Sequence, residues 1–404
     1  MIATIEGSHI ALPGLASAHS HAFQRALRGR THRARGSFWS WRGLMYELAA
    51  KVTPEDVYDL SRFAFVELAC SGVTAVGEFH YLHHQPDGTP YADRNELADA
   101  VTRAALDAGL RITLLRVLYR RAGFGRTVEG AQRRFVDADV DRALADIDAY
   151  RARWKHEPRV RAGVAPHSVR AVPIEWIEAA ARFARERELP FHMHVAEQRR
   201  EVQECLAEHG LRPVELLADR GVLDERFVAV HATHLAEHEA RALGAAPSFV
   251  CICRTTERDL GDGLPPLAPL LASGARLTFG VDSHASSDPF EEARAAELDE
   301  RSRTERRCAA ADGETLLAAA TREGYAAIGA AGLEREDRVL LDRGRPELAG
   351  APEGALLDDA VVFATGARSV DVVEVAGVRI VERGRHARQD EAREAYEAAL
   401  RRLL

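Results

Sequence analysis

The stretch Leu15-Ala16-Ser17-Ala18-His19-Ser20-His21 ends a short apolar run with two histidines that stand two residues apart. Alternate side chains of a β-strand point to the same face, so His19 and His21 would face one side of a sheet. Two imidazoles on one side can bind the same metal ion. This stretch therefore predicts a first strand and half of a metal site.

Three later segments resemble it in placing polar side chains where a strand-like run ends. They are, in chain order, His192-Met193-His194-Val195-Ala196-Glu197, His231-Ala232-Thr233-His234 and Gly280-Val281-Asp282-Ser283-His284. Each is followed by a helical stretch. In a parallel barrel the carboxyl ends of all strands converge on one mouth, so these residues would meet around one ion.

Strand-like and helical stretches alternate through most of the chain. The predicted strands are 15–21, 74–79, 111–118, 160–166, 190–194, 227–231, 249–253 and 277–281, and the helices include 54–72, 95–108, 173–187, 199–219 and 290–302. Eight such units predict an α/β fold, a (β/α)8 TIM barrel over residues 13–312. An open doubly wound sheet is the alternative, but it would not have polar residues at so many strand ends.

The two chain ends are predicted to form a small β-sandwich-like appendage from residues 1–12 and 340–388. After a helix at 314–330, short strands are expected at 360–363, 370–375 and 378–382, and a surface helix is expected over 389–404. The segment Phe38-Trp39-Ser40-Trp41-Arg42 is assigned to a long loop.

Composition excludes several classes of protein. The 404-residue chain has a net charge of −8, which leaves no basic surplus for general nucleic-acid binding. No apolar run approaches the roughly 20 residues of a membrane helix, so no membrane partner is expected. The five cysteines form no CxxC pair, which is typical of a reducing compartment and predicts a cytoplasmic protein.

The residues at the strand ends predict the ligands of a metal ion and a general acid and base. His194 and Asp282 would complete the set begun by His19 and His21, and three imidazoles with one carboxylate suit a catalytic Zn²⁺, although Fe²⁺ would accept them too. His192 shares a face with His194, and we choose His194 because Glu197 follows it at the strand edge. Glu197 is the candidate general acid and base; its alternative is an exposed acid in the first turn of a helix.

More specific motifs carry a resemblance over about residues 13 to 300. They are His19-Ser20-His21-Ala22-Phe23-Gln24-Arg25-Ala26, Phe38-Trp39-Ser40-Trp41-Arg42, Glu78-Phe79-His80-Tyr81, His167-Ser168-Val169-Arg170, His194-Val195-Ala196-Glu197-Gln198 and Leu260-Gly261-Asp262-Gly263. Together they resemble the formimidoylglutamate deiminases of the amidohydrolase superfamily. The resemblance implies zinc-dependent hydrolysis of N-formimino-L-glutamate to N-formyl-L-glutamate and ammonia in histidine degradation, by a homodimer.

The resemblance also implies a role for each matching residue. The metal ligands would be His19, His21, His194 and Asp282, the catalytic residues Glu197, His231 and Asp282, and the substrate contacts Gln24, Arg42, Tyr81, His167 and Arg170. Asp282 would take a proton from the attacking water, Glu197 would protonate the departing nitrogen, and His231 would stabilise the tetrahedral intermediate. Arg42 and Arg170 suit a small dicarboxylate substrate, because a guanidinium matches carboxylate geometry.

Two departures and two alternatives accompany this interpretation. The opening segment is shorter than the family leads us to expect, and Arg254 and Arg258 make the seventh strand end unusually basic, which would shift substrate preference if they faced the pocket. A nucleobase or aryl-amine deaminase on the same scaffold is one alternative. The other is a catalytically silent barrel that acts as a binding protein, although no ligand position here is vacant.

Overall fold

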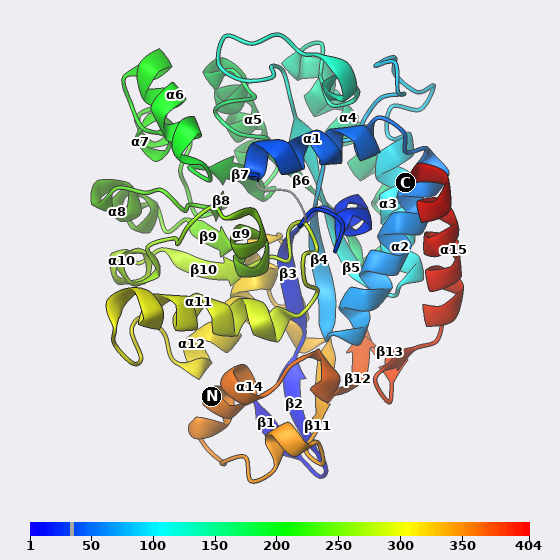
Figure 1. The fold of residues 1–404 in the computed structure, drawn as a ribbon, viewed down its shortest axis with the longest axis vertical. Helices are drawn as coiled ribbons and strands as arrows, with labels where there is room; N and C mark the ends of the chain where they lie inside the picture. The colour runs from blue at the N-terminus through cyan, green and yellow to red at the C-terminus, as the bar shows by residue number, and fades with distance from the viewer. Residues whose placement is uncertain (33–35) are drawn as a thin grey trace.

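Eight parallel strands form the centre of the molecule in the computed structural model, which describes residues 1–32 and 36–404 (Figure 1). They are β3 (Leu15–Ser20), β4 (Val73–His80), β5 (Arg111–Leu118), β6 (Val160–Pro166), β7 (Phe191–Val195), β8 (Phe227–His231), β9 (Phe249–Ile252) and β10 (Arg276–Phe279). Each pairs with the next in chain order. The backbone N–H of Asp282, beyond β10, donates to the carbonyl of His19 (3.1 Å), so the ends of the sheet meet. The predicted (β/α)8 barrel is confirmed.

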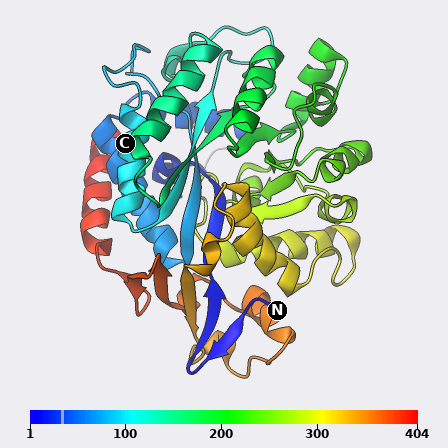
Figure 2. The same ribbon diagram turned by 180° about the vertical axis from the view of Figure 1, so that it is seen from behind.

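Helices cover the outside of this barrel (Figures 1 and 2). They are α2 (Pro54–Cys70), α3 (Glu96–Asp107), α4 (Val140–Trp154), α5 (Ile174–Glu186), α6 (Arg199–His209), α7 (Pro213–Asp219), α8 (Glu237–Ala245), α9 (Arg254–Leu260), α10 (Leu267–Ser273), α11 (Pro289–Thr304), α12 (Gly313–Ala318) and α13 (Gly324–Ala327). Every residue of β4 and β5 is buried, as expected of strands covered on both faces. Among the described residues, no helix combines the length and the apolarity that crossing a membrane requires.

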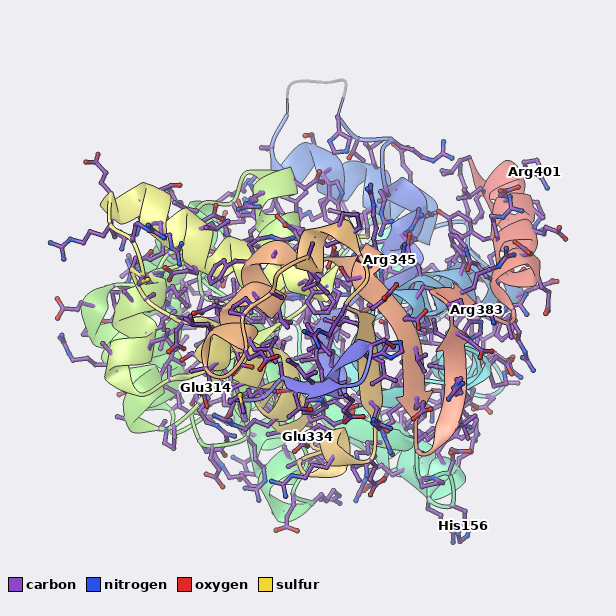
Figure 3. The ribbon with its side chains drawn as sticks, turned by 90° about the horizontal axis from the view of Figure 1, so that it is seen from below. His156, Glu314, Glu334, Arg345, Arg383 and Arg401 are labelled. Carbon is purple, nitrogen blue, oxygen red and sulfur yellow. The ribbon has the colours of Figure 1, made fainter. Side chains whose placement is uncertain are left out.

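The chain ends build a six-stranded antiparallel sheet at the amino ends of the barrel strands, which Figure 3 shows from below with Arg345 and Arg383 labelled. Its strands, in sheet order, are β1 (Thr4–Glu6), β2 (His9–Pro13), β11 (Arg338–Asp342), β12 (Val370–Val375), β13 (Val378–Glu382) and β14 (Arg385–His386). Because β11 lies between β2 and β12, the opening residues are tied to the last part of the chain.

The last helix, α15 (Gln389–Leu403), packs along α2 on the outside of the barrel (Figure 1). Arg62 of α2 forms an ion pair with Glu391 (2.7 Å), and Arg402 forms one with Asp56 (2.7 Å). The tail is therefore held against the barrel.

The segment assigned to a loop at 38–42 is instead the start of a helix, α1 (Phe38–Ala49), so that prediction is wrong. Ser37 caps this helix, and Phe38, Met45 and Leu48 are buried along it at helical spacing. Figure 1 shows α1 crossing the carboxyl ends of the strands.

Two other local predictions are also wrong. The expected strand at 360–363 lies inside α14 (Leu356–Ala364), where Leu357 and Val361 are four residues apart and both buried. The expected helix at 199–219 is interrupted between α6 and α7, because Gly210 adopts a left-handed conformation (φ 70°) and Pro213 begins a new helix.

Candidate metal centre and active site

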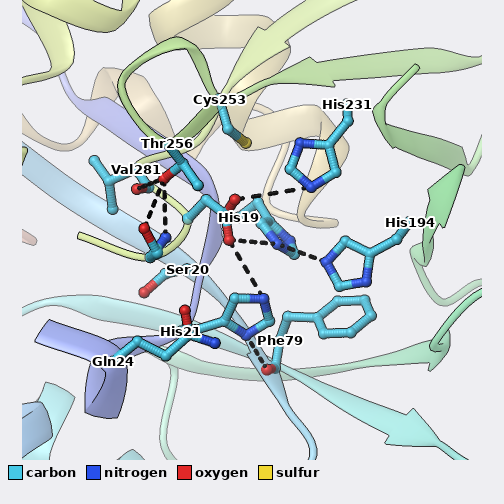
Figure 4. A network of polar contacts seen from close by, with 12 residues as sticks. His19, Ser20, His21, Gln24, Phe79, His194, His231, Cys253, Thr256 and Val281 are labelled. Atoms are coloured by element: carbon cyan, nitrogen blue, oxygen red, sulfur yellow. Dashed lines mark hydrogen bonds and ion pairs between the residues drawn. The ribbon is translucent and has the colours of Figure 1, made fainter. Parts of the chain in front are cut away.

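Four predicted ligands converge at the mouth of the barrel. Figure 4 shows three of them, His19, His21 and His194, lying together. The Nε2 atoms of His19 and His194 are 3.1 Å apart. Asp282 Oδ1 lies 3.5 Å from His19 Nε2 and 3.4 Å from His21 Nε2. His19 lies on β3 and His21 directly after it, His194 lies on β7, and Asp282 lies in the turn after β10. The barrel therefore brings the four side chains together from distant parts of the chain.

The protonation of these histidines fits a cation. The Nδ1–H of His21 donates to the carbonyl of Phe79 (2.9 Å), and that of His194 donates to the carbonyl of His167 (3.2 Å). Each therefore directs a bare Nε2 lone pair into the cluster. Burial lowers the pKa of His21 to about 3 and holds those of His19 and His194 well below the usual value. Neutral nitrogen lone pairs facing one another beside a carboxylate match the donor set of a divalent transition metal.

The directions of the two imidazoles show which of His192 and His194 can be a metal ligand. His192 Nε2 donates to the carbonyl of Ala327 (2.8 Å), deeper in the barrel. Only His194 of the two lies in the three-histidine cluster with His19 and His21.

His231, at the end of β8, lies across Asp282 from the three-histidine cluster. Its Nδ1 is 3.3 Å from Glu257 Oε1 and its Nε2 is 3.7 Å from Asp282 Oδ2. Burial opposes protonation of His231, but Glu197, Glu257 and Asp282 together raise its pKa well above the usual value. The two oxygens of Asp282 thus face different partners, Oδ1 toward His19 and His21 and Oδ2 toward His231.

Glu197 lines the cavity next to the cluster and is 5% exposed. Burial raises the pKa of its carboxyl, while His231 and Arg170 act in the opposite direction. A carboxyl with a raised pKa can hold a proton near neutral pH and give it to a substrate. The alternative of an exposed helix-start acid does not hold, because this side chain is buried.

The turn before Glu197 is held by a second buried acid, Glu201 of α6. Its Oε1 accepts from the backbone N–H of Ala196 (3.0 Å), a residue with φ of 51°. A left-handed alanine is strained, so it persists only where its surroundings fix it. Glu201 therefore positions Glu197 through the backbone.

We expect Glu201→Ala to lower kcat by about tenfold, since it removes one buried hydrogen bond from this turn. Glu201→Gln retains an acceptor oxygen and should recover most of kcat, whereas a loss of fold stability alone would leave kcat per folded molecule unchanged. Steady-state kinetics with thermal unfolding on both variants checks this result.

One cavity brings the predicted substrate contacts together with the metal cluster. Its lining includes Gln24, Arg42, Tyr81, His167 and Arg170. Gln24 Nε2 donates to the hydroxyl of Tyr81 (2.7 Å). The structure thus places all five around one space, and their contacts with a substrate remain predictions.

The two arginines are held by aromatic rings. The guanidinium carbon of Arg42 lies 4.5 Å from the ring centre of Trp39, and that of Arg170 lies 5.5 Å from it. Arg170 is 4% exposed, and its Nη1 has no hydrogen-bond partner among the described residues. Within the same residues neither arginine forms an ion pair. Burial opposes the charge of Arg170, and the nearby carboxylates of Glu201 and Glu197 raise its pKa. Neither accepts a hydrogen bond from Arg170 among these residues, so its free N–H donors favour an anionic ligand.

Arg254 and Arg258 do not contribute to this cavity. Arg254 pairs with Glu257 and Asp299, and Arg258 pairs with Asp299 and Glu291. These ion pairs neutralise both arginines, so the basic segment after the seventh barrel strand adds no cation to the cavity.

Several residues of the site were not predicted from the sequence. Tyr119 directly follows β5, so it stands at a strand end like the predicted ligands. Tyr46 stands four residues after Arg42 on α1, which the loop assignment concealed. Glu201 and Glu257 have no comparable sequence signal, because their roles depend on contacts that form only in the folded chain.

Three imidazoles and a carboxylate at the mouth of a (β/α)8 barrel, beside a buried acid, define a metal-dependent hydrolase. The model of the amidohydrolase family matches residues 10–333, and the chain belongs to this family.

Known relatives agree with this assignment. The chain is 39% identical to formimidoylglutamate deiminase of Pseudomonas aeruginosa over 97% of its own length and 89% of that protein. It is 31% identical to 8-oxoguanine deaminase of the same organism, over 69% of this chain and 61% of that protein. A crystal structure of an amidohydrolase from Brucella melitensis is similar with a TM-score of 0.90 and 35% identity, over 99% of this chain and 95% of that one.

Proposed function

We propose that this protein hydrolyses the formimino group of N-formimino-L-glutamate to give N-formyl-L-glutamate and ammonia, with Zn²⁺ as its metal. The proposal is carried by the buried guanidinium of Arg170, whose Nη1 has no hydrogen-bond partner among the described residues and which lines the same cavity as the metal cluster. Together with Arg42 it matches a substrate with two carboxylates. The similarity to formimidoylglutamate deiminase supports the same substrate.

His19, His21, His194 and Asp282 would hold the metal. A bound Zn²⁺ supplies Lewis acidity, which favours loss of a proton from water near neutral pH. The set of three nitrogens and one oxygen favours zinc, and Fe²⁺ in the purified protein is the other outcome of metal analysis.

The residues of the chain divide the proton transfers. Asp282 Oδ2, which faces His231, takes a proton from the attacking water while the water oxygen bonds to the formimino carbon. Glu197 gives a proton to the imino nitrogen, and His231 stabilises the charge that develops on the attacking oxygen. The bond between the carbon and this nitrogen then breaks: the departing nitrogen takes the proton held by Asp282 and leaves as ammonia. The hydroxyl proton of the intermediate returns to Glu197 as the formyl carbonyl forms. Glu257 holds the His231 ring in place throughout.

Ammonia release from N-formimino-L-glutamate by the purified protein tests the proposal, with 8-oxoguanine, guanine and cytosine in parallel. We expect release from the formimino compound alone. Release from a base, with none from the formimino compound, would establish the nucleobase deaminase alternative, which the 31% identical relative represents. No release from any of them by the metal-loaded protein would favour a catalytically silent barrel.

Arg170→Gln should raise KM for N-formimino-L-glutamate by roughly 10- to 100-fold, because a buried charge-assisted contact is lost. Arg161→Gln is a matched control at the start of β6, where the arginine donates to the carbonyl of Pro158. An unchanged KM in Arg170→Gln would show that Arg170 does not bind the substrate.

The proposal extends to the setting of the reaction. It places the protein in histidine degradation, in the cytoplasm and as a homodimer. Light scattering of the purified protein tests the oligomeric state, and growth of a deletion strain on histidine as nitrogen source tests the pathway.

A further inference from the structure

Two tyrosines line the cavity beside the arginines. Tyr46 comes from α1 and Tyr119 directly follows β5. Gln132, from the short helix η2 (Gly130–Arg134), lies behind both of them. Its Nε2 donates to the hydroxyl oxygen of Tyr46 (3.2 Å) and to that of Tyr119 (3.0 Å). One amide group therefore orients two phenols.

Burial and the neighbouring hydroxyl of Tyr46, which lies within hydrogen-bonding reach, raise the pKa of Tyr119. One hydroxyl can donate to the other, and the pair keeps a hydroxyl proton available for a ligand. A phenol oxygen accepts hydrogen bonds and donates one. Gln132 occupies an acceptor position on each tyrosine, and within the described residues no carbonyl or carboxylate accepts from either hydroxyl. The guanidinium carbon of Arg42 lies 5.4 Å from the ring centre of Tyr46. Donors and cations thus gather without an acceptor, which suits a carboxylate ligand.

Ring contacts show how far this group lies from the metal cluster. The ring of His167 is 4.9 Å from that of His194, and the ring of Tyr119 is 5.0 Å from that of His167. Tyr81, by contrast, is 5.2 Å from His21 itself. The formimino carbon must lie at the cluster, so the carboxylate at the end of the substrate's side chain is the one that reaches Tyr119.

We propose that Tyr46 and Tyr119, oriented by Gln132, bind the side-chain carboxylate of the substrate and set the preference for an acidic side chain. This inference rests on the proposed function, because it assigns one group of that substrate to one part of the cavity. Phe135 packs against both tyrosine rings, at 5.7 Å in each case, and limits their movement.

The test compares Tyr46→Phe, Tyr119→Phe and the double variant on two substrates, N-formimino-L-glutamate and its neutral isostere N-formimino-L-glutamine. Each change removes one oxygen and keeps the ring. We expect KM for the glutamate compound to rise about tenfold per hydroxyl, with little change in kcat and little change for the glutamine compound. Where the glutamine compound turns over too slowly, its inhibition constant replaces its KM.

Two further variants serve as controls. Gln132→Leu keeps both hydroxyls but removes the amide that donates to both of them. It should therefore also raise KM for N-formimino-L-glutamate. Tyr58→Phe removes a hydroxyl that donates to Asp107 on the outer helices. It should leave KM unchanged for both substrates. Equal losses for both substrates in the cavity variants would overturn the inference.

Calorimetric binding of glutarate to the wild type and to the double variant separates this inference from the proposed reaction. Glutarate has two carboxylates and no formimino group. Weaker binding to the double variant supports the inference even if the wild type releases no ammonia, a result that would overturn the reaction alone. Unchanged glutarate affinity together with normal ammonia release would overturn the inference alone.

Discussion

Glu197→Gln is expected to lower kcat by about 10²- to 10⁴-fold, the usual contribution of a positioned general acid and base. This loss corresponds to roughly 3–5 kcal/mol of transition-state stabilisation. The amide has almost the same shape as the carboxyl but cannot transfer the proton. KM should change little, because Arg42 and Arg170 remain in place. Steady-state ammonia release at saturating substrate gives the measurement.

Metal content distinguishes this loss from a damaged site. Glu197 lies outside the proposed ligand set, so Glu197→Gln should bind the same amount of metal as the wild type. Glu204→Gln, on α6 where the side chain pairs with Arg200, is the matched control and should retain full activity. Turnover near the wild-type level in Glu197→Gln would remove this residue from the mechanism.

The barrel and its metal cluster could be predicted because parallel strands follow a local rule. Strand-like runs with histidines or acids at their ends are visible in the sequence, and closure of the barrel brings those ends together. His19, His21, His194 and Asp282 each stand at or just beyond such an end, and they converge as expected. The sequence pattern was therefore sufficient wherever position along a strand determined position in space.

Residues outside the strands needed the structure. The aromatic segment at 38–42 reads as a loop, because its helix depends on burial of Phe38 and Met45 against the rest of the molecule. That helix carries Arg42 and Tyr46 over the mouth. Glu257 and Glu201 act through His231 and Ala196, and such contacts have no fixed spacing along the chain.

Three residues beside the metal cluster have positive φ angles. His231 (φ 70°), Asp282 (φ 50°) and Ala196 (φ 51°) all adopt left-handed conformations without being glycine. Each such residue costs about 1–3 kcal/mol and persists where the surrounding structure fixes it. All three lie at the mouth, and their turns aim the side chains of His231, Asp282 and Glu197 into the cavity.

Removal of the metal by a chelator is expected to abolish ammonia release and to lower the thermal unfolding temperature, and Zn²⁺ should restore both. The activity depends on the Lewis acidity that the ion supplies. The stability depends on the ion because a metal binds the folded chain, in which the Nε2 atoms of His19 and His194 lie 3.1 Å apart, and not the unfolded chain, in which the ligands are dispersed. The unfolding temperature therefore reports metal binding independently of turnover.

A pair of variants on one strand separates ligation from general loss of structure. His194→Asn should prevent stoichiometric binding of Zn²⁺, because it removes one of the converging nitrogens. His192→Asn alters a buried histidine two residues away that bonds Ala327 instead, so it should bind a full equivalent of metal even if its unfolding temperature falls. Full metal content in His194→Asn, or turnover that survives chelation, would contradict the ligand set. Because the two side chains share a face of β7 and differ only in depth, this comparison tests whether the metal lies at the carboxyl end of the barrel.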